Sequence, residues 1–171
     1  IALQGKGRGP VTLGYLLPLC AMPAQAAAAA CMFTSNVTPF AADTSSLVDN
    51  AGIPAPEVEA SSLTRGIGGG ATCDSLGFMS IQLKWPRGSD YDLDEIGFEY
   101  RVVGGDAPAG MLPEAVVVAP ASGRRVEHQF TWQDVPAGEQ KPLYLQLEVR
   151  AVTRDRQRGA PARVTVHAPG S

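Results

Sequence analysis

Short runs in which apolar and polar residues alternate recur along the chain, and the clearest one spans residues 80–85. Ile81, Leu83 and Trp85 fall on one side of this run, and polar residues fall on the other. Successive side chains of a β-strand point to opposite faces, so the alternation predicts a strand with one face in a core. Pro86 is expected to end this strand, because proline has no N–H to donate to a sheet.

Runs of the same kind predict six more strands, at residues 57–63, 96–103, 115–119, 125–132, 143–151 and 163–167. Segments rich in Gly, Pro and Asp separate the runs, and no long window shows a helical period. The pattern therefore predicts an all-β fold, a seven-stranded antiparallel β-sandwich. In such a sandwich we expect Trp85 to be a core residue packed against Tyr100, Phe130 and Leu147.

The N-terminal residues differ from the rest of the chain. Lys6 and Arg8 precede an apolar run at residues 11–19, and Ala24 and Ala26 supply the small residues of a cleavage site. This arrangement predicts a secretory signal peptide at residues 1–26. A retained membrane anchor is the alternative, because residues 11–33 carry almost no charge and are about long enough to cross a bilayer.

The cysteines are informative once the signal peptide is set aside. The chain has three cysteines, and removal of residues 1–26 removes Cys20 and leaves Cys31 and Cys73. Two cysteines in an exported chain predict a disulfide between them. Residues 28–31, Ala-Ala-Ala-Cys, also resemble the lipobox of bacterial lipoproteins, in which the cysteine is lipidated, although the usual Leu or Val is missing. Both states of Cys31 remain open at this point.

The boundaries of the predicted parts follow from composition. Residues 27–54 are rich in Ala, Ser, Thr and Pro without a sustained period, so they are expected to form a flexible arm, a disordered or extended linker. The sandwich is expected at residues 55–169. The glycine-rich residues 66–73 lead into another strand and lack the Lys of a phosphate-binding loop, so they are interpreted as a connector.

The charge balance excludes some classes of partner. The net charge is -3 and 18% of the residues are charged, so the chain carries no basic patch of the kind that binds nucleic acid. We expect an exported protein that is periplasmic, associated with the outer membrane or extracellular. Contact with a membrane is expected only through an uncleaved signal or a lipidated Cys31, and the sequence indicates no oligomeric state.

Residues that could carry chemistry are few. The acidic residues Asp90, Asp92 and Asp94 alternate as at the start of a calcium-binding loop, but Arg101 stands where that loop needs a bidentate Glu. A solvated turn is therefore favoured over a calcium site. His128 lies on the apolar side of a predicted strand and has no neighbouring metal ligands in the sequence. We expect no cofactor, no catalytic residues and no bound metal.

Several motifs suggest a family. The chain reads Leu-Lys-Trp-Pro at residues 83–86, Asp-Tyr-Asp-Leu at 90–93 and Phe-Glu-Tyr-Arg-Val at 98–102. These motifs resemble the second and third strands of bacterial fibronectin type III domains, where an L-x-W strand leads through an acidic loop to Y-x-V. Residues 145–152 and the turn at 158–161 are similar to the family's later strand and the Gly- and Pro-rich turn that follows it.

The resemblance covers roughly residues 55–169 and implies a partition of the strands. The first, second and fifth strands would form one sheet, and the third, fourth, sixth and seventh would form the other. Leu145 stands where the family often has a tyrosine. The resemblance also implies a row of charged and polar side chains on the outer face of the second sheet: Glu99, Arg101, Gln146, Glu148 and Arg150.

The function predicted from these observations is a non-catalytic module of the cell envelope that binds a protein or another envelope component, or that acts as a spacer. Exposed aromatic and arginine side chains dominate binding energies, so the predicted binding residues are Arg87, Tyr91, Tyr144 and Arg154. The alternative is a small secreted hydrolase or metal-dependent enzyme that uses His128 with the acidic loop at residues 86–95.

Overall fold

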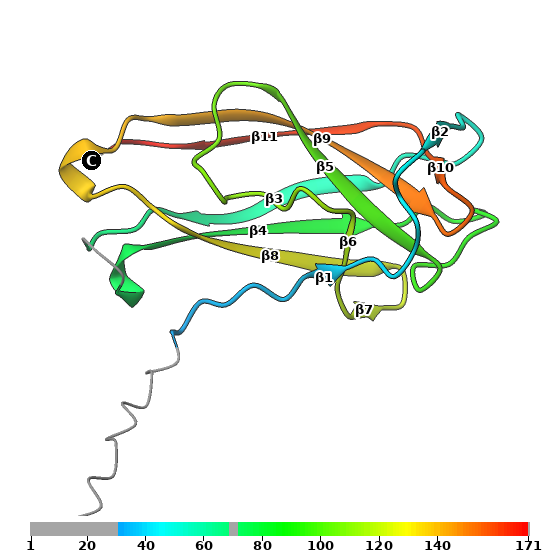
Figure 1. The fold of residues 1–171 in the computed structure, drawn as a ribbon, viewed down its shortest axis with the longest axis horizontal. Helices are drawn as coiled ribbons and strands as arrows, with labels where there is room; N and C mark the ends of the chain where they lie inside the picture. The colour runs from blue at the N-terminus through cyan, green and yellow to red at the C-terminus, as the bar shows by residue number, and fades with distance from the viewer. Residues whose placement is uncertain (1–30, 69–71, 171) are drawn as a thin grey trace, which may run out of the picture. The chain divides into compact units, whose positions relative to one another are not determined.

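The computed structural model describes residues 31–68 and 72–170, so the predicted signal peptide at residues 1–26 lies outside the described residues. The described residues form two β-sheets packed face to face (Figure 1). No helix of the described residues is long and apolar enough to span a membrane. The described residues also contain two single turns of 3-10 helix, η1 (Cys73–Ser75) and η2 (Ala137–Glu139).

Sheet B is antiparallel and has four strands in the order β3-β4-β8-β7. Its strands are β3 (Glu57–Thr64), β4 (Leu76–Lys84), β8 (Arg125–Gln133) and β7 (Ala121–Ser122).

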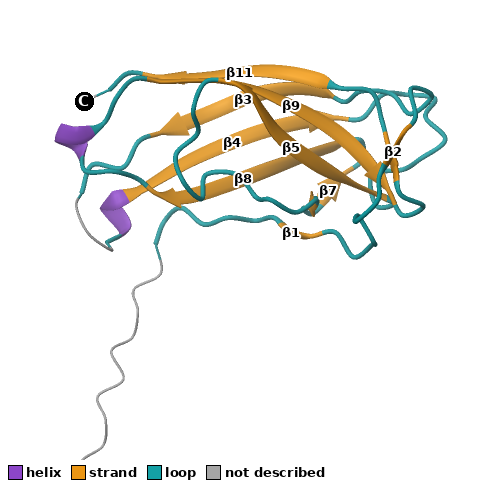
Figure 2. Cartoon of the chain, turned by 45° about the horizontal axis from the view of Figure 1, so that its top comes forward, coloured by secondary structure: helices purple, strands orange, loops and turns teal. Residues whose placement is uncertain are grey.

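Sheet A has seven strands in the order β1-β6-β5-β9-β10-β2, and β11 also pairs with β9. Its strands are β1 (Thr38–Pro39), β6 (Val117–Val118), β5 (Ile96–Gly104), β9 (Leu143–Thr153), β10 (Gln157–Arg158), β2 (Val48–Asp49) and β11 (Ala162–Ala168). Figure 2 shows the molecule after rotation, with β11 beside β3 along the top and β5 crossing in front of sheet B.

The all-β, two-sheet architecture confirms the coarse prediction, and each predicted run contains a strand. The first, second and fifth predicted strands, now β3, β4 and β8, share sheet B, and the other four share sheet A. The count of seven antiparallel strands was wrong. The short strands β1, β2, β7 and β10 extend the sheets within the described residues, and β2 runs parallel to β10. Strands of two residues are too short to show an alternation in the sequence.

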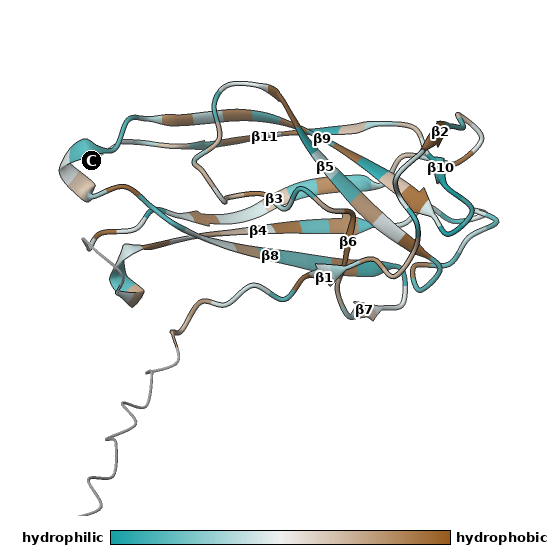
Figure 3. Cartoon of the chain, viewed as in Figure 1, coloured by the Kyte–Doolittle hydropathy of each residue, from teal (hydrophilic) through white to brown (hydrophobic). Residues whose placement is uncertain are grey.

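Hydrophobic and hydrophilic residues alternate along the long strands (Figure 3), and the hydrophobic set fills the space between the sheets. Trp85 is 2% exposed, its ring meets the Phe98 ring edge-on at a centroid distance of 6.2 Å, and its Nε1–H donates to the Tyr91 carbonyl at 2.7 Å. The prediction that Trp85 lies in the core is confirmed. Tyr100 and Phe130 belong to the same core and pack edge to face with each other at 5.0 Å.

Residues 31–54, the described part of the linker predicted at residues 27–54, are extended but pack on the sandwich. Their strand β1 pairs with β6, and their strand β2 pairs with β10. Phe40 is 7% exposed and Ile53 is 2% exposed, so both side chains are buried. We call residues 31–40 the N-terminal arm. The sequence did not indicate this packing, because isolated apolar residues without a period give no pattern to read.

A disulfide joins Cys31 to Cys73 across a sequence separation of 42, with an S–S distance of 1.97 Å. This bond confirms the predicted pairing. The Cys31 sulfur is bonded to Cys73 in this structure, so it does not carry the lipid that the alternative requires. A disulfide indicates an environment outside the reducing cytoplasm.

Candidate binding site at the β7–β8 hairpin

The hairpin between β7 and β8 forms a ridge at one end of sheet B. Ser122 pairs with Arg125, which leaves Gly123 and Arg124 as the turn. Gly123 has φ 58°, a left-handed conformation that favours glycine and suits a tight hairpin. The turn at Gly123 and Arg124 thus forms the ridge between the two strands. One hollow lies on each side of this ridge.

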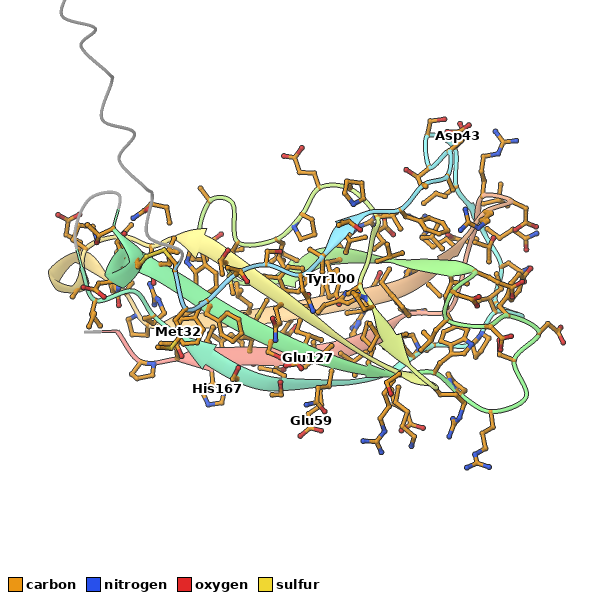
Figure 4. The ribbon with its side chains drawn as sticks, turned by 90° about the horizontal axis from the view of Figure 1, so that it is seen from below. Met32, Asp43, Glu59, Tyr100, Glu127 and His167 are labelled. Carbon is orange, nitrogen blue, oxygen red and sulfur yellow. A yellow bond between two sulfur atoms is a disulfide. The ribbon has the colours of Figure 1, made fainter. Side chains whose placement is uncertain are left out.

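The first hollow, which we call the face hollow, has a volume of about 700 Å³ and lies on the outer face of sheet B. Charged and polar side chains from three neighbouring strands and the hairpin line it: Glu57, Glu59, Gln82, Lys84, Ser122, Arg125 and Glu127. Figure 4 views the molecule from below and labels Glu59 on β3 and Glu127 on β8. The face hollow therefore presents charges of both signs to a ligand.

The strand register places these charges in two rows. Glu57, Lys84 and Arg125 are opposite one another across the sheet, and Lys84 Nζ lies 2.9 Å from Glu57 Oε2. The hydrogen bond from Lys84 and the charge of Lys84 lower the pKa of Glu57. In the next row Glu59 and Glu127 flank Gln82.

A chain of hydroxyl groups holds the Glu127 carboxylate in place. Ser61 Oγ donates to Ser80 Oγ at 2.8 Å, and Ser80 Oγ donates in turn to Glu127 Oε1. Ser80 is only 1% exposed although it lies on the outer face. Glu59, Glu127 and Arg125 form no ion pair among the described residues. Glu127 accepts the Ser80 hydrogen bond, while Glu59 and Arg125 can interact with solvent or a ligand.

The second hollow, which we call the loop hollow, has a volume of about 480 Å³ and lies between the hairpin turn and the loop from β4 to β5. Arg87 and Tyr91 line it together with Asp92, Asp94 and Arg124. Two hydrogen bonds with Trp85 fix the two segments that line this hollow. The indole N–H donates to the Tyr91 carbonyl at 2.7 Å, and Arg124 Nη1 donates to the Trp85 carbonyl at 2.7 Å. The loop hollow is thus fixed to the core.

The structure brings together two of the four predicted binding residues. Arg87 and Tyr91 line the loop hollow. Arg154 follows β9, and its guanidinium donates to the Ala41 carbonyl at 3.2 Å and lies 5.2 Å from the centre of the Phe40 ring. Tyr144 is 57% exposed, but it lies at the opposite end of β9 from Arg154. Sequence reasoning missed Glu59, Arg125 and Glu127, because only the strand register shows that they share one hollow.

The acidic loop does not form a calcium-binding cluster among the described residues. Of Asp90, Asp92 and Asp94, two line the loop hollow, and the Asp92 N–H donates to Glu95 Oε2 at 2.9 Å. The described part of the chain contains no group of three or more His, Cys, Asp or Glu side chains that could hold a metal ion. These residues are therefore described as part of the loop that borders the loop hollow.

His128 lies in the core and is 0% exposed. Its Nδ1 is 2.8 Å from the Tyr100 hydroxyl, and its ring meets the Phe98 and Phe130 rings edge-on. Burial lowers the pKa of His128 to about 4 and raises the pKa of Tyr100, so both side chains are neutral near pH 7. A base in this position has no access to a substrate at the surface, so the hydrolase alternative loses the histidine on which it relied.

Comparison of the chain with models of protein families, with curated proteins and with solved structures gives no match. A function therefore has to be argued from the two hollows, the charges that line them and the ridge that separates them.

Proposed function

We propose that the chain is an exported, non-catalytic β-sandwich module of the cell envelope, similar to fibronectin type III domains, that binds a protein partner at the β7–β8 hairpin. The observation that carries this proposal is the pair of hollows on the two sides of the β7–β8 hairpin. The Cys31–Cys73 disulfide supports export, because such bonds persist in oxidising compartments.

The side chains around the ridge suit protein recognition. Tyr91 and Arg87 are of the residue types that most often dominate binding energy, and Trp85 holds the loop that carries them. In the face hollow, Arg125 suits an acidic group of the partner, while Glu59 and Glu127 suit a basic one. We therefore expect a partner surface that presents charges of both signs, with binding that weakens as salt is added.

The test is crosslinking capture from envelope extracts with the purified chain and its variants, followed by quantitative mass spectrometry. Arg125→Ala and Tyr91→Ala are each expected to lower capture of the partner about tenfold, which corresponds to about 1.4 kcal/mol. Tyr144→Ala removes an exposed aromatic side chain at the other end of β9 and is the matched control, with capture unchanged. Melting temperatures of all variants separate loss of binding from loss of fold.

Two results would contradict the proposal. If Arg125→Ala and Tyr91→Ala capture as much partner as the parent does, the binding surface does not lie at the ridge. Absence of any partner that exceeds the level of a denatured-protein control would favour a spacer role instead.

A further inference from the structure

Two inner strands of the fold each carry an arginine and a glutamate two residues apart on their outer faces. On β9 the pair is Glu148 and Arg150, and on β8 it is Arg125 and Glu127. Residues i and i+2 of a strand lie on the same face about 7 Å apart, a distance that two long side chains can bridge. The two pairs have the same spacing, but their side chains interact differently.

The pair on β9 is closed on itself. Arg150 Nε lies 2.8 Å from Glu148 Oε1, and Arg163 of the next strand lies 3.7 Å from the same carboxylate. The strand register also places Glu99 of β5 opposite Arg150. The charges of this pair therefore have partners within the chain.

The pair on β8 is open. Arg125 and Glu127 are both exposed, and neither forms an ion pair with another described residue. Glu127 Oε1 instead accepts a hydrogen bond from Ser80 Oγ on the neighbouring strand β4, and Ser61 Oγ donates to Ser80 Oγ in turn. A carboxylate offers about four acceptor positions, so Glu127 can still accept hydrogen bonds from a ligand. The hydroxyl groups thus position one charge of the pair and leave both charges available.

The face hollow gives a partner access to this open pair. The hollow lies between β3 and the β7–β8 hairpin, and its volume of about 700 Å³ is within the range of ligand-binding sites. Glu59 of β3 also lines it, on the other side of Gln82 from Glu127, and offers a second position for a basic group (Figure 4). The hollow therefore suits a partner with at least one acidic and one basic group.

We propose that the face hollow binds an extended segment of the protein partner in which an acidic and a basic residue stand two positions apart. This inference rests on the proposed function and specifies the part of the partner that is recognised. An extended segment places residues i and i+2 on one side about 7 Å apart, which is the spacing of Arg125 and Glu127. A segment that lies along β8 can therefore pair with both charges at once. Charges on adjacent residues point to opposite sides of an extended segment, so only one of them reaches the hollow.

The experiment compares two synthetic peptides of identical composition, both rich in Thr and Ser and each with one Glu and one Lys. In the first peptide Glu and Lys are two positions apart, and in the second they are adjacent. The full chain is biotinylated and assembled on streptavidin, because multivalent display strengthens weak binding, and surface plasmon resonance measures its binding to the immobilised peptides. We expect the first peptide to bind about fivefold more tightly at low salt, with a smaller difference at high salt.

Variants of the chain link the preference to the two side chains. Arg125→Gln and Glu127→Gln should each remove the preference for the first peptide, because each leaves only one charge of the pair. Glu127→Arg should switch the preference to a peptide with two Glu residues two positions apart. Arg163→Gln removes an exposed arginine from the outer face of sheet A and is the matched control, with the preference unchanged. Melting temperatures show whether each variant is folded.

Two results would overturn the inference. One is equal binding of the two peptides to the parent chain, which includes the absence of binding to either. The other is a preference that persists in both Arg125→Gln and Glu127→Gln. The capture experiment on the proposed function has a separate outcome: if capture from extracts still depends on Arg125 and Tyr91 while the peptides bind equally, the binding surface stands and only the spacing rule fails.

Discussion

The outer faces of the two sheets are both polar, but their charges are used differently. On sheet A, Glu99 lies opposite Arg150 and Arg101 lies opposite Glu148, so opposite charges face each other across β5 and β9, as the family resemblance implied. Arg150 Nε is 2.8 Å from Glu148 Oε1, and Arg163 also reaches Glu148 at 3.7 Å. The charges of this face are largely neutralised within the chain.

Arg158 extends this network across the edge strands. Its guanidinium lies 2.7 Å from Asp49 and 3.3 Å from Glu99, and it joins β2, β10 and β5. The contact with Asp49 raises the pKa of Arg158 and lowers the pKa of Asp49. On sheet B, by contrast, Glu59 and Arg125 form no ion pair among the described residues. The difference is that sheet A pairs most of its outer charges with one another, whereas sheet B pairs Lys84 with Glu57 and leaves Glu59 and Arg125 without an ion pair among the described residues.

The largest expected effect concerns the core residue beneath the loop hollow. Trp85→Ala removes a side chain that is 2% exposed and that donates a hydrogen bond to the Tyr91 carbonyl. The substitution should therefore lower the free energy of unfolding by about 3 to 5 kcal/mol. The measurement is urea denaturation followed by circular dichroism. Tyr144→Ala, which removes an aromatic ring from the surface of sheet A, is the control and should cost less than about 1 kcal/mol. A Trp85→Ala chain as stable as the parent would contradict the packing on which the comparison rests.

The second prediction concerns the pH dependence of stability that comes from His128, which is buried between the two sheets. His128 is neutral in the fold because burial lowers its pKa to about 4, whereas in the unfolded chain it takes up a proton near pH 6.5. The unfolded state therefore binds more protons between these values. Stability should fall as the pH drops from about 6.5 to about 4, by up to about 3 kcal/mol in total.

Urea denaturation at several pH values measures this slope, and two variants isolate its source. His128→Phe removes the buried titrating group, so the difference between parent and variant stability should lose this pH dependence. His167→Gln removes the exposed histidine of β11 and should leave the slope intact. A His128→Phe chain with the parent's slope between pH 6.5 and 4 would show that other groups are responsible.

The smallest effects test the comparison of the two faces most directly, because one isosteric change is made on each. Glu99→Gln on sheet A weakens pairs with Arg158 and Arg101 and should lower stability by roughly 0.5 to 1 kcal/mol at low salt, and by less in high salt. Glu59→Gln on sheet B should change stability by less than about 0.5 kcal/mol. Denaturation at two salt concentrations measures both. If Glu99→Gln and Glu59→Gln lower the free energy of unfolding equally, the ion pairs of sheet A do not stabilise the fold more than the unpaired charges of sheet B do.

The sequence was sufficient for seven of the strands and for part of the candidate site. Ile81 and Leu83 are read as inward residues from their neighbours alone, because the two-residue period of a strand is a local property. Arg87 and Tyr91 were predicted because exposed aromatic and arginine side chains dominate binding energies, which is a property of residue type. Arg125 and Glu127 were not assigned to the site, because their neighbours in space, Lys84 and Gln82, are set by the register of β4 against β8.

From the sequence alone came the positions of seven strands, the inward position of Trp85 and the expectation that Cys31 pairs with Cys73, because periodicity and cysteine number are properties of the chain itself. Only the tertiary structure decided that residues 31–40 cover the edge of β8, that Phe40 is buried and that two hollows flank the β7–β8 hairpin. These features depend on contacts between segments that are distant in the chain. A local sequence pattern therefore does not indicate them.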